Sequence, residues 1–474
     1  MSIHPAQPVL FDFLDGRTLV VEASAASLTS DAGLLPIRQL DERLGFTRQL
    51  AAVIDDPRDP DLVEHSVLAM LRMRLYGILA GYEDQNDHDV LRSDPVFKLV
   101  ADRLPSDPDL ASQPTLSRFE NAISIASLKR LRDVFIDQFI AAFTTPPRAL
   151  LFDLDAVDDP THGQQQLTLF HGYYEQYQYF PLLITCANND LLVMVSLRPG
   201  TVHAALGADD DLEYLVQRLR IVWPDVRIEV RGDAGFGVPL MYDVCERLGL
   251  TYTFGLSGNR VLQERSAALL AQAVAQYTAA HEPQRLFDQF RYQAGSWPHE
   301  RQVAVKAEAN VHGTNRRFVV TNRPGAALCP QGCYDDYIGR GESENRNKEW
   351  KCGLAGDRLS DHRFLANYFR LYLHSAALNL LVRLRQIVAV PAPPVVEEPA
   401  VAARPEAVAQ RQRHNARRRR DPLGEGQPAT WRLLLIKVAA EVVESCRRVV
   451  VRLSGSWPYL DYYQQVSVAV AGGT

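Results

Sequence analysis

The chain contains little cysteine, and the few thiols are widely scattered. Six cysteines in 474 residues are typical of a protein in a reducing compartment and argue against a disulfide-stabilised secreted fold. Two of them are only four residues apart, but no second pair follows at zinc-knuckle spacing, so we expect no structural zinc site. The six are Cys186, Cys245, Cys329, Cys333, Cys352 and Cys446.

Long apolar runs are also absent. No stretch reaches the roughly 18 consecutive apolar residues that a membrane-spanning helix needs. Residues 1–16 have neither the basic start nor the long apolar centre of a secretory signal. These absences predict a cytoplasmic protein that does not contact a membrane.

The chain has no excess of positive charge. Its net charge is −6, with 46% hydrophobic and 23% charged residues, a composition typical of a globular protein with a sizeable core. A length of 474 residues allows about three domains. The negative total argues against a simple nucleic-acid coat, although large DNA enzymes concentrate their basic residues locally.

The most informative stretch is residues 337–351, YIGRGESENRNKEWK. If this stretch is one α-helix, Glu344, Lys351 and Tyr337 fall at about 40°, 20° and 60° from Arg340 around the helix axis. The four side chains would then form one narrow polar stripe, where a surface helix usually has an apolar one.

Such a stripe fits an anionic ligand. Arg, Lys and Tyr can bind phosphate oxygens, and a carboxylate among them is favourable when a divalent cation lies between it and the phosphate. The alternative is an exposed, ion-paired helix, because Glu with Lys or Arg at helical spacing is common.

Three further acidic residues lie on predicted strands. ALLFDLDAV at 149–157 reads as a buried strand that places Asp153 and Asp155 on one face. A carboxylate there is costly unless it is paired or binds metal. Asp233 ends the strand VRIEVRGD and precedes Gly235 and Gly237, at an edge where α/β sheets bind ligands. The alternative for Asp233 is a turn or helix-capping role.

The pattern predicts an α/β fold with a helical region before it. Residues 1–147 contain three helical stretches, at 30–46, 59–82 and 112–143. This region has 22 acidic and 14 basic residues, so it carries an excess of negative charge. Strands at 149–157, 166–187, 191–200 and 226–233, with a helix before the last, predict the first part of the catalytic domain at 148–257. Asp155 and Asp233 are 78 residues apart, whereas Asp233 and Glu344 are 111 apart, which is too far for a simple loop.

The long separation predicts a β-rich insertion at 258–330, with the second part of the catalytic domain at 331–387. Trp297 in this insertion is a candidate to stack on a displaced base, although a packing role is favoured. A long helix over 357–386 is expected to cover the sheet. Residues 388–428 form a Pro/Ala/Arg-rich linker, and 429–474 form an ordered segment that docks on the core.

The linker ends in a basic run. RQRHNARRRR at 411–420 contains six arginines and no acid, so it would attract phosphate non-specifically, or serve as a solubilising tail. The four consecutive candidates for DNA contact are Arg417, Arg418, Arg419 and Arg420.

The spacing of Tyr337, Arg340, Glu344 and Lys351 resembles the Tyr-Arg-Glu-Lys signature of group 1 DDE transposases from bacterial insertion sequences. The segments at 159–174, 231–237 and 314–325 also resemble this family, over nearly the whole chain. The resemblance implies a ribonuclease H-like catalytic core, whose strand and helix order matches the predicted one. It also assigns residues 1–147 to recognition of transposon ends.

The resemblance implies a transposase that binds terminal inverted repeats, cleaves the DNA ends and transfers the 3′ ends into target DNA. Asp155, Asp233 and Glu344 would hold two Mg²⁺ ions, with Mn²⁺ able to substitute, while Tyr337, Arg340 and Lys351 bind phosphate. Such a protein would act as a homodimer on paired ends and associate with the bacterial nucleoid when bound to DNA.

The first aspartate departs from the family pattern. In related motifs Thr stands two positions after the catalytic Asp, whereas Asp155 is followed by Ala156 and Val157. We predict Asp155 rather than Asp153 as the metal ligand, and the departure leaves the activity of this copy open. Two alternatives remain: a metal-dependent nuclease of the same fold, and a catalytically decayed DNA-binding protein. His162, His171 and His203 do not match the spacing of zinc hydrolases.

Overall fold

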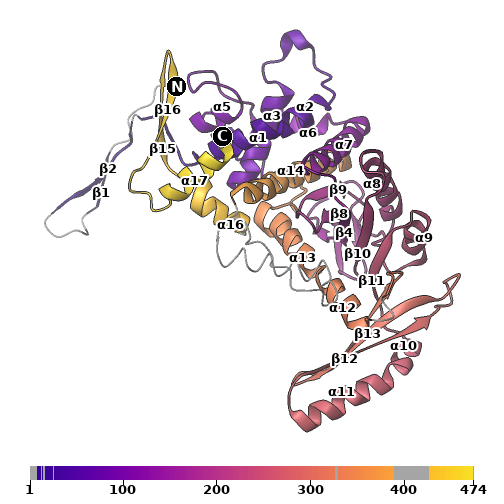
Figure 1. Ribbon diagram of the computed structural model, residues 1–474. Helices are drawn as coiled ribbons and strands as arrows, with labels where there is room; N and C mark the ends of the chain where they lie inside the picture. Colours follow the sequence, from indigo (N-terminus) through magenta and orange to yellow (C-terminus); the bar gives the residue numbers. More distant parts are fainter. Residues whose placement is uncertain are drawn as a thin grey trace.

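The computed structural model describes residues 8–11, 13, 17–24, 26–325, 329–388 and 426–472. It is a mixed α/β protein with a helical body, a large central sheet and an arm that projects from the sheet (Figure 1). None of the helices in these ranges is long and apolar enough to cross a membrane. The structure therefore confirms the predicted α/β class. The predicted arginines 417–420 lie outside the described residues.

The N-terminal region is helical, as predicted, but two of its helices differ from their predicted form. The stretch predicted at 59–82 begins as a short 3-10 turn, η1 (Pro60–Leu62), and its helix starts only after the Ser66 side chain caps it. The stretch predicted at 112–143 is two helices with a break between them. The region contains α1 (Leu34–Leu44), α2 (Phe46–Ala52), α3 (Val67–Ala80), α4 (His88–Leu91), α5 (Pro95–Val100), α6 (Gln113–Asn121) and α7 (Ile125–Ala141).

Helix α3 has no exposed polar face, because twelve of its 14 residues are buried. It carries two arginines, Arg72 and Arg74, into the interior, where carboxylates pair with both of them. A helix covered on all sides no longer needs a polar face. The environment of α3 is therefore set by the elements that pack on all sides of it.

The central sheet has eight strands in the order β12-β13-β14-β11-β10-β4-β8-β9. Strand β4 (Ala149–Ala156) runs parallel to β10 (Arg227–Gly232), which runs parallel to β11 (Thr251–Leu256). On the other side of β4, β8 (Leu182–Cys186) and β9 (Leu192–Ser196) form an antiparallel pair of strands. The strands predicted at 149–157 and 226–233 are thus neighbours at the centre of the sheet.

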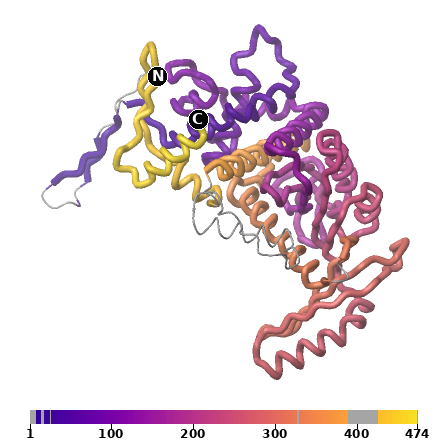
Figure 2. Tube along the Cα trace, viewed as in Figure 1, coloured from indigo at the N-terminus to yellow at the C-terminus, as the bar shows by residue number. Residues whose placement is uncertain are grey.

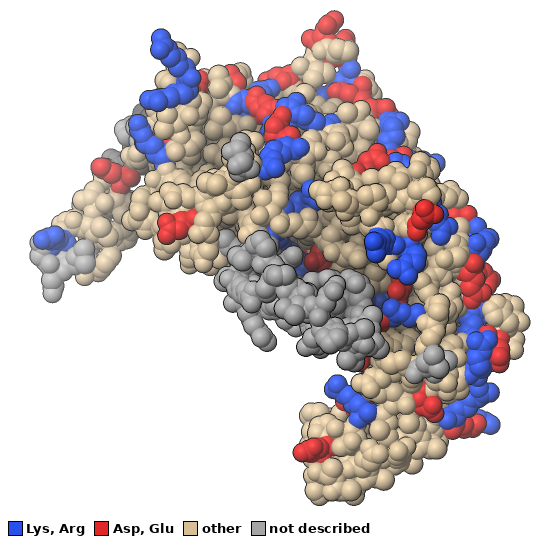
Figure 3. All heavy atoms as spheres, in the orientation of Figure 1, with Lys and Arg blue, Asp and Glu red and all other residues tan. Residues whose placement is uncertain are grey.

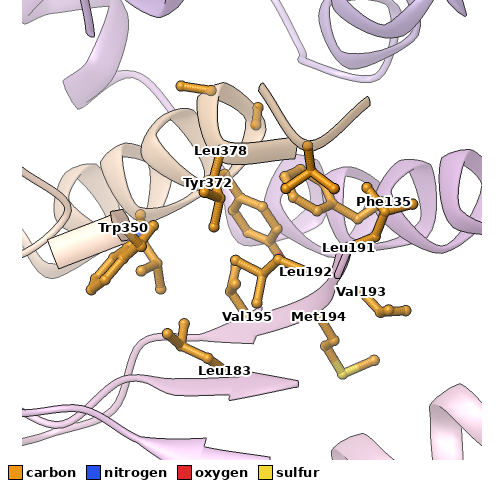
Figure 4. Packing of buried hydrophobic residues seen from close by; sticks show 14 of the residues in the cluster. Phe135, Leu183, Leu191, Leu192, Val193, Met194, Val195, Trp350, Tyr372 and Leu378 are labelled. Carbon is orange, nitrogen blue, oxygen red and sulfur yellow. The ribbon is translucent and has the colours of Figure 1, made fainter. Parts of the chain in front are cut away.

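The long helix α14 (Phe364–Val388) joins the sheet to the helical body. It starts seven residues later than predicted, and it contacts β9 on one side and α3, α6 and α7 on others. Figure 4 shows Tyr372 and Leu378 of α14 among Phe135 of α7 and residues of β8 and β9. Helix α14, which was predicted to cover the sheet, therefore also lies at the core of the helical body. Two further helices, α8 (Ala208–Val222) and α9 (Pro239–Arg247), lie before and after β10 in sequence.

The segment predicted as a β-rich insertion opens with two helices, α10 (Arg260–Arg265) and α11 (Ala267–Ala280), which the sequence analysis did not anticipate. Three strands follow, as a β-rich insertion requires: β12 (Gln284–Tyr292), β13 (Arg301–Asn310) and β14 (Gly313–Thr321). Strand β14 pairs with β11, so these strands extend the central sheet and project with α11 as an arm (Figure 2). The end of the arm is largely uncharged, whereas both charge signs are interspersed over the body (Figure 3).

The C-terminal segment docks on the helical body. It comprises α16 (Pro428–Trp431), the π-helix η3 (Arg432–Ile436), β15 (Ala440–Ser445), β16 (Arg448–Leu453) and α17 (Leu460–Ala471). Helix α17 contacts α1 and α14, and β15 pairs with β3 (Leu28–Thr29) near the N-terminus. The N-terminal strands β1 (Val9–Phe11) and β2 (Leu19–Val21) form a hairpin that projects at the end opposite the arm (Figure 1).

A buried ion triad ties three helices of the body together. Glu120 on α6 accepts a hydrogen bond from Nε of Arg74 on α3 at 2.6 Å and one from Nε of Arg370 on α14 at 2.6 Å. Burial would raise the pKa of Glu120, but the two guanidinium groups prevail and lower it to about 2. The triad therefore stabilises the body through an ionised carboxylate that is fully buried.

We expect Glu120→Gln to lower the free energy of unfolding by about 3–5 kcal/mol, because it leaves two buried guanidinium groups without their carboxylate. Urea denaturation at pH 7 measures this change. Glu264→Gln, which removes the exposed pair between Arg260 and Glu264, is the matched control and should cost less than about 1 kcal/mol. Equal effects of the two substitutions would contradict the role of the triad.

The stability difference between wild type and Glu120→Gln should become smaller as the pH falls. The folded-state pKa of Glu120 is lowered from 4.5 to about 2. Its contribution is therefore fully present above about pH 4.5 and is lost as the pH falls through about 2. Denaturation series at pH 7, 5, 4 and 3 test this, and a difference that grows on acidification would contradict it.

Candidate active site

Two of the predicted acidic residues meet at one edge of the central sheet. Asp155 lies near the carboxyl end of β4, and Asp233 directly follows the last residue of β10. Gly232 lies opposite Leu154 in the parallel pairing, so both aspartates emerge at the same edge. The register of β4 and β10 therefore brings together residues that are 78 positions apart.

The segment 337–351 is not one α-helix, so the condition under which its four side chains form a single stripe is not met. Helix α12 (Pro330–Ile338) ends at Gly339, α13 (Gly341–Lys348) begins at Gly341, and the chain then widens into the π-helix η2 (Glu349–Gly353). The two glycines favour the interruption, and the π-helix coincides with the complete burial of Trp350. The angular positions computed for a regular helix therefore do not apply to Lys351.

Three of the four predicted residues in this segment still gather at the sheet edge. Nη2 of Arg340 lies 2.6 Å from Oε1 of Glu344, and its Nη1 lies 3.7 Å from Oδ2 of Asp155. The same oxygen of Asp155 accepts a hydrogen bond from Nδ2 of Asn347 at 2.6 Å. Asn347 was not predicted from the sequence, although it stands three residues after Glu344 on the same helix.

The surroundings make the charge of Asp155 unfavourable. Burial raises its pKa to about 7, Arg340 opposes that rise, and the carboxylates of Asp233, Glu344 and Asp153 add to it. The carboxylates of Asp155, Asp233 and Glu344 therefore repel one another across a common space. The guanidinium group of Arg340 offsets only part of this repulsion.

Asp153 has a different environment from Asp155. Its two carboxylate oxygens accept hydrogen bonds from Nε and Nη2 of Arg231 at 2.6 and 2.7 Å, and both side chains are buried. Nη1 of Arg231 donates to the backbone oxygen of Asp336 at 2.7 Å. Asp153 is thus neutralised within the fold, while Asp155 faces the other carboxylates. This difference supports the choice of Asp155 over Asp153.

Tyr337 lies beside Asp233. A Cβ atom at Gly255 on β11 would come within 2.6 Å of the Tyr337 hydroxyl and 3.1 Å of the backbone carbon of Asp233. Burial raises the pKa of Tyr337, Arg340 lowers it, and Asp233 raises it further. The absence of a side chain at Gly255 therefore makes room for this hydroxyl at the sheet edge.

Lys351 does not reach the other three residues of its motif. Its Nζ lies 3.0 Å from Oδ1 of Asp158 and donates a hydrogen bond to the backbone oxygen of Asp158 at 2.9 Å. Burial, Asp357 and Asp158 raise the pKa of the neighbouring Asp159 well above its usual value, while Lys351 opposes the rise. No pattern in the sequence pointed to the Asp-Asp-Pro sequence after β4 as part of the site, so this group of acids around Lys351 was not predicted.

The donor atoms at the sheet edge suit a hard divalent cation, because Asp155, Asp233 and Glu344 offer only carboxylate oxygens. The Glu344 side chain is 51% exposed and turned toward Arg340. Within the described ranges, no three His, Cys, Asp or Glu side chains gather closely enough to hold a metal ion. The chemistry of the site therefore fits a metal, and Glu344 must leave Arg340 to complete a set of ligands.

The model of the family "Transposase DDE domain group 1" matches residues 11–393 of the chain. The chain belongs to the DDE transposase family. A search of curated proteins found no match. Members of this family act on DNA and generally use divalent metal ions, which agrees with the acidic sheet edge described above.

The two aspartates of β4 should affect stability in opposite directions in the absence of metal. Asp153→Asn leaves Arg231 buried without a counter-charge and should destabilise the protein by about 3–5 kcal/mol. Because the pKa of Asp155 is raised to about 7, its ionised form weakens folding as the pH rises through 7. Asp155→Asn should therefore stabilise the protein at pH 8 by about 1–3 kcal/mol.

Denaturation in EDTA at pH 8 compares the two variants with wild type. At pH 4 the gain from Asp155→Asn should disappear, because the wild-type carboxyl group is then protonated in the folded state. A loss of stability in Asp155→Asn at pH 8, or no loss in Asp153→Asn, would contradict this description of the site.

Proposed function

We propose that this DDE transposase cleaves the ends of its insertion sequence and transfers the freed 3′ ends into target DNA. The observation that carries the proposal is that Asp155 and Asp233 emerge at one sheet edge near Glu344, where burial raises the pKa of Asp155 to about 7 and the charges of Asp233 and Glu344 add to the rise. The strand order β9-β8-β4-β10-β11, antiparallel on one side of β4 and parallel on the other, supports a ribonuclease H-like core.

We assign the three carboxylates to binding of two Mg²⁺ ions, or Mn²⁺ in their place. Bound at this edge, such ions would activate the attacking water or 3′ hydroxyl and stabilise the leaving oxygen. Arg340 bridges Asp155 and Glu344 in the protein alone, so its guanidinium group is placed to bind the scissile phosphate when Glu344 turns to a metal. Asn347 holds the Asp155 carboxylate in place through its amide.

The remaining motif residues would act around this centre. The Tyr337 hydroxyl, beside Asp233, would donate a hydrogen bond to a phosphate oxygen. Lys351 would hold the loop at Asp158 that follows β4, and would reach phosphate only by leaving Asp158. Its proposed role as a phosphate ligand thus has less support than the roles of Arg340 and Tyr337.

The partner in this proposal is DNA with the terminal inverted repeats, together with target DNA. The helical region of residues 1–147 would recognise the repeats, and two copies of the chain would bind the paired ends. Arg417 to Arg420 would add non-specific contacts with phosphate. On the face that Figure 3 shows, both charge signs are interspersed over the body, which agrees with recognition by a limited surface rather than by a broad basic one.

The test is cleavage of labelled DNA that carries the terminal repeats, with Mg²⁺ or Ca²⁺, by wild type and by Asp155→Ala, Asp233→Ala and Glu344→Ala. Each variant should lower the cleavage rate by at least about a thousandfold while binding of the repeats persists. Asp225→Asn is the control, because this exposed residue precedes the opposite end of the strand that leads to Asp233.

The outcome also separates the alternatives. Cutting at the repeat boundary followed by joining to a second DNA supports a transposase. Cutting without joining and without dependence on the repeats indicates a nuclease, and specific binding without any cutting indicates a decayed copy. Retention of cleavage in Asp155→Ala, with its loss in a folded Asp153→Ala, would contradict the assignment of the first ligand.

A further inference from the structure

An exposed group of aromatic side chains lies on one hairpin of the catalytic region. Strands β6 (Leu169–His171) and β7 (Gln176–Tyr179) form this hairpin, and Tyr173 at its turn is 84% exposed. Phe170 and Tyr177 lie opposite each other on one face at 49% and 60% exposure. So much exposed aromatic surface on a short hairpin indicates an interaction site.

The base of the hairpin is fixed to the core, although its turn is exposed. Tyr179 is fully buried and donates a hydrogen bond to the backbone oxygen of Gln166 at 2.7 Å. Strand β7 also pairs with β5 (Asp159–Pro160), which follows β4. At Gly200 a Cβ atom would come within 2.0 Å of the backbone oxygen of Gln178, so the next loop also packs closely against β7. The turn is therefore held at a defined place.

That place is next to the acidic sheet edge, because Nε2 of Gln176 on β7 donates a hydrogen bond to Oδ2 of Asp158 at 3.4 Å, and Leu183 of β8, three residues after Phe180, pairs with Asp155. The Tyr174 ring packs on His171 at 5.0 Å and on the buried Phe180 at 5.9 Å, between ring centroids. Burial raises the pKa of Tyr174, and the charges of Asp158, Asp233 and Asp155 raise it further. The ring of Tyr173 stands nearly perpendicular to that of Tyr174, at 87° and 5.0 Å, with its faces largely in solvent.

The segment from Leu167 to Phe180 contains one acidic residue, Glu175, and no lysine or arginine. It therefore offers flat rings rather than charges to a partner. Trp297, for which packing was favoured over stacking on a base, is only 6% exposed and packs against Tyr242 and Tyr292, which confirms the packing role. Among these aromatic residues, the exposed rings beside the carboxylates are those of the hairpin.

We propose that Tyr173 stacks on an unpaired base of the DNA strand next to the scissile phosphate, with Tyr174 positioning its ring. This inference rests on the proposed function, because the base belongs to the DNA that the sheet edge would cleave. Stacking on an aromatic ring tolerates any base and compensates for part of the cost of unpairing it. The hairpin would thereby help open the DNA end where the carboxylates act.

The test compares full-length wild type, Tyr173→Ala and Tyr173→Trp on two terminal-repeat substrates. One substrate is fully paired, and the other has unpaired bases beside the cleavage site. On paired DNA, Tyr173→Ala should cleave roughly ten- to a hundredfold more slowly than wild type, and Tyr173→Trp should stay near the wild-type rate. On the unpaired substrate, the defect of Tyr173→Ala should shrink severalfold. Tyr462→Ala, a partly exposed tyrosine on α17, is the control and should leave both rates unchanged.

The result that overturns the inference is an equal rate for wild type and Tyr173→Ala on paired DNA, or an equal defect on both substrates. A change in oligomeric state of Tyr173→Ala in sedimentation, with unchanged cleavage, would assign the hairpin to protein contact and also overturn it. If wild type cleaves neither substrate, the proposed function fails first, so the two failures can be distinguished.

Discussion

The geometry of the sheet edge depends on the guanidinium group of Arg231. It binds both carboxylate oxygens of Asp153 on β4 and the backbone oxygen of Asp336 on α12. One buried side chain on β10 thus joins the two central parallel strands to the helix that carries Tyr337. A buried ion pair of this kind adds little net stability compared with apolar packing, but it specifies which elements lie together. Through these contacts Arg231 positions the sheet edge where Asp155 and Asp233 meet.

The fold thereby holds several like charges close together. Asp155, Asp233 and Glu344 would repel one another less if they were apart, and Arg340 offsets only part of the cost. The stability of the rest of the molecule, including the triad of Glu120, Arg74 and Arg370, permits this unfavourable arrangement. Like charges held by a stable scaffold are suited to bind divalent cations, since the cation relieves the repulsion.

Local patterns in the sequence predicted much of the fold and site. The buried strand with Asp155, the strand that ends before Asp233 and the long helix over the sheet each follow from runs of apolar residues, and the structure confirms them. Features that depend on tertiary contacts were not predictable. The π-helix that turns Lys351 toward Asp158 and the partner of Asp153 both depend on residues distant in sequence.

The most direct test of this description is proton release on metal binding, measured by calorimetric titration of Mn²⁺ in buffers of different ionisation enthalpy. Because the pKa of Asp155 is raised to about 7, binding at pH 7 should release about half a proton from this group, and almost none at pH 9. Asp155→Asn should abolish the release. Tight binding without a pH-dependent release of protons, or release that persists in Asp155→Asn, would contradict the conclusion that burial and the neighbouring carboxylates hold a proton on Asp155 until metal binds.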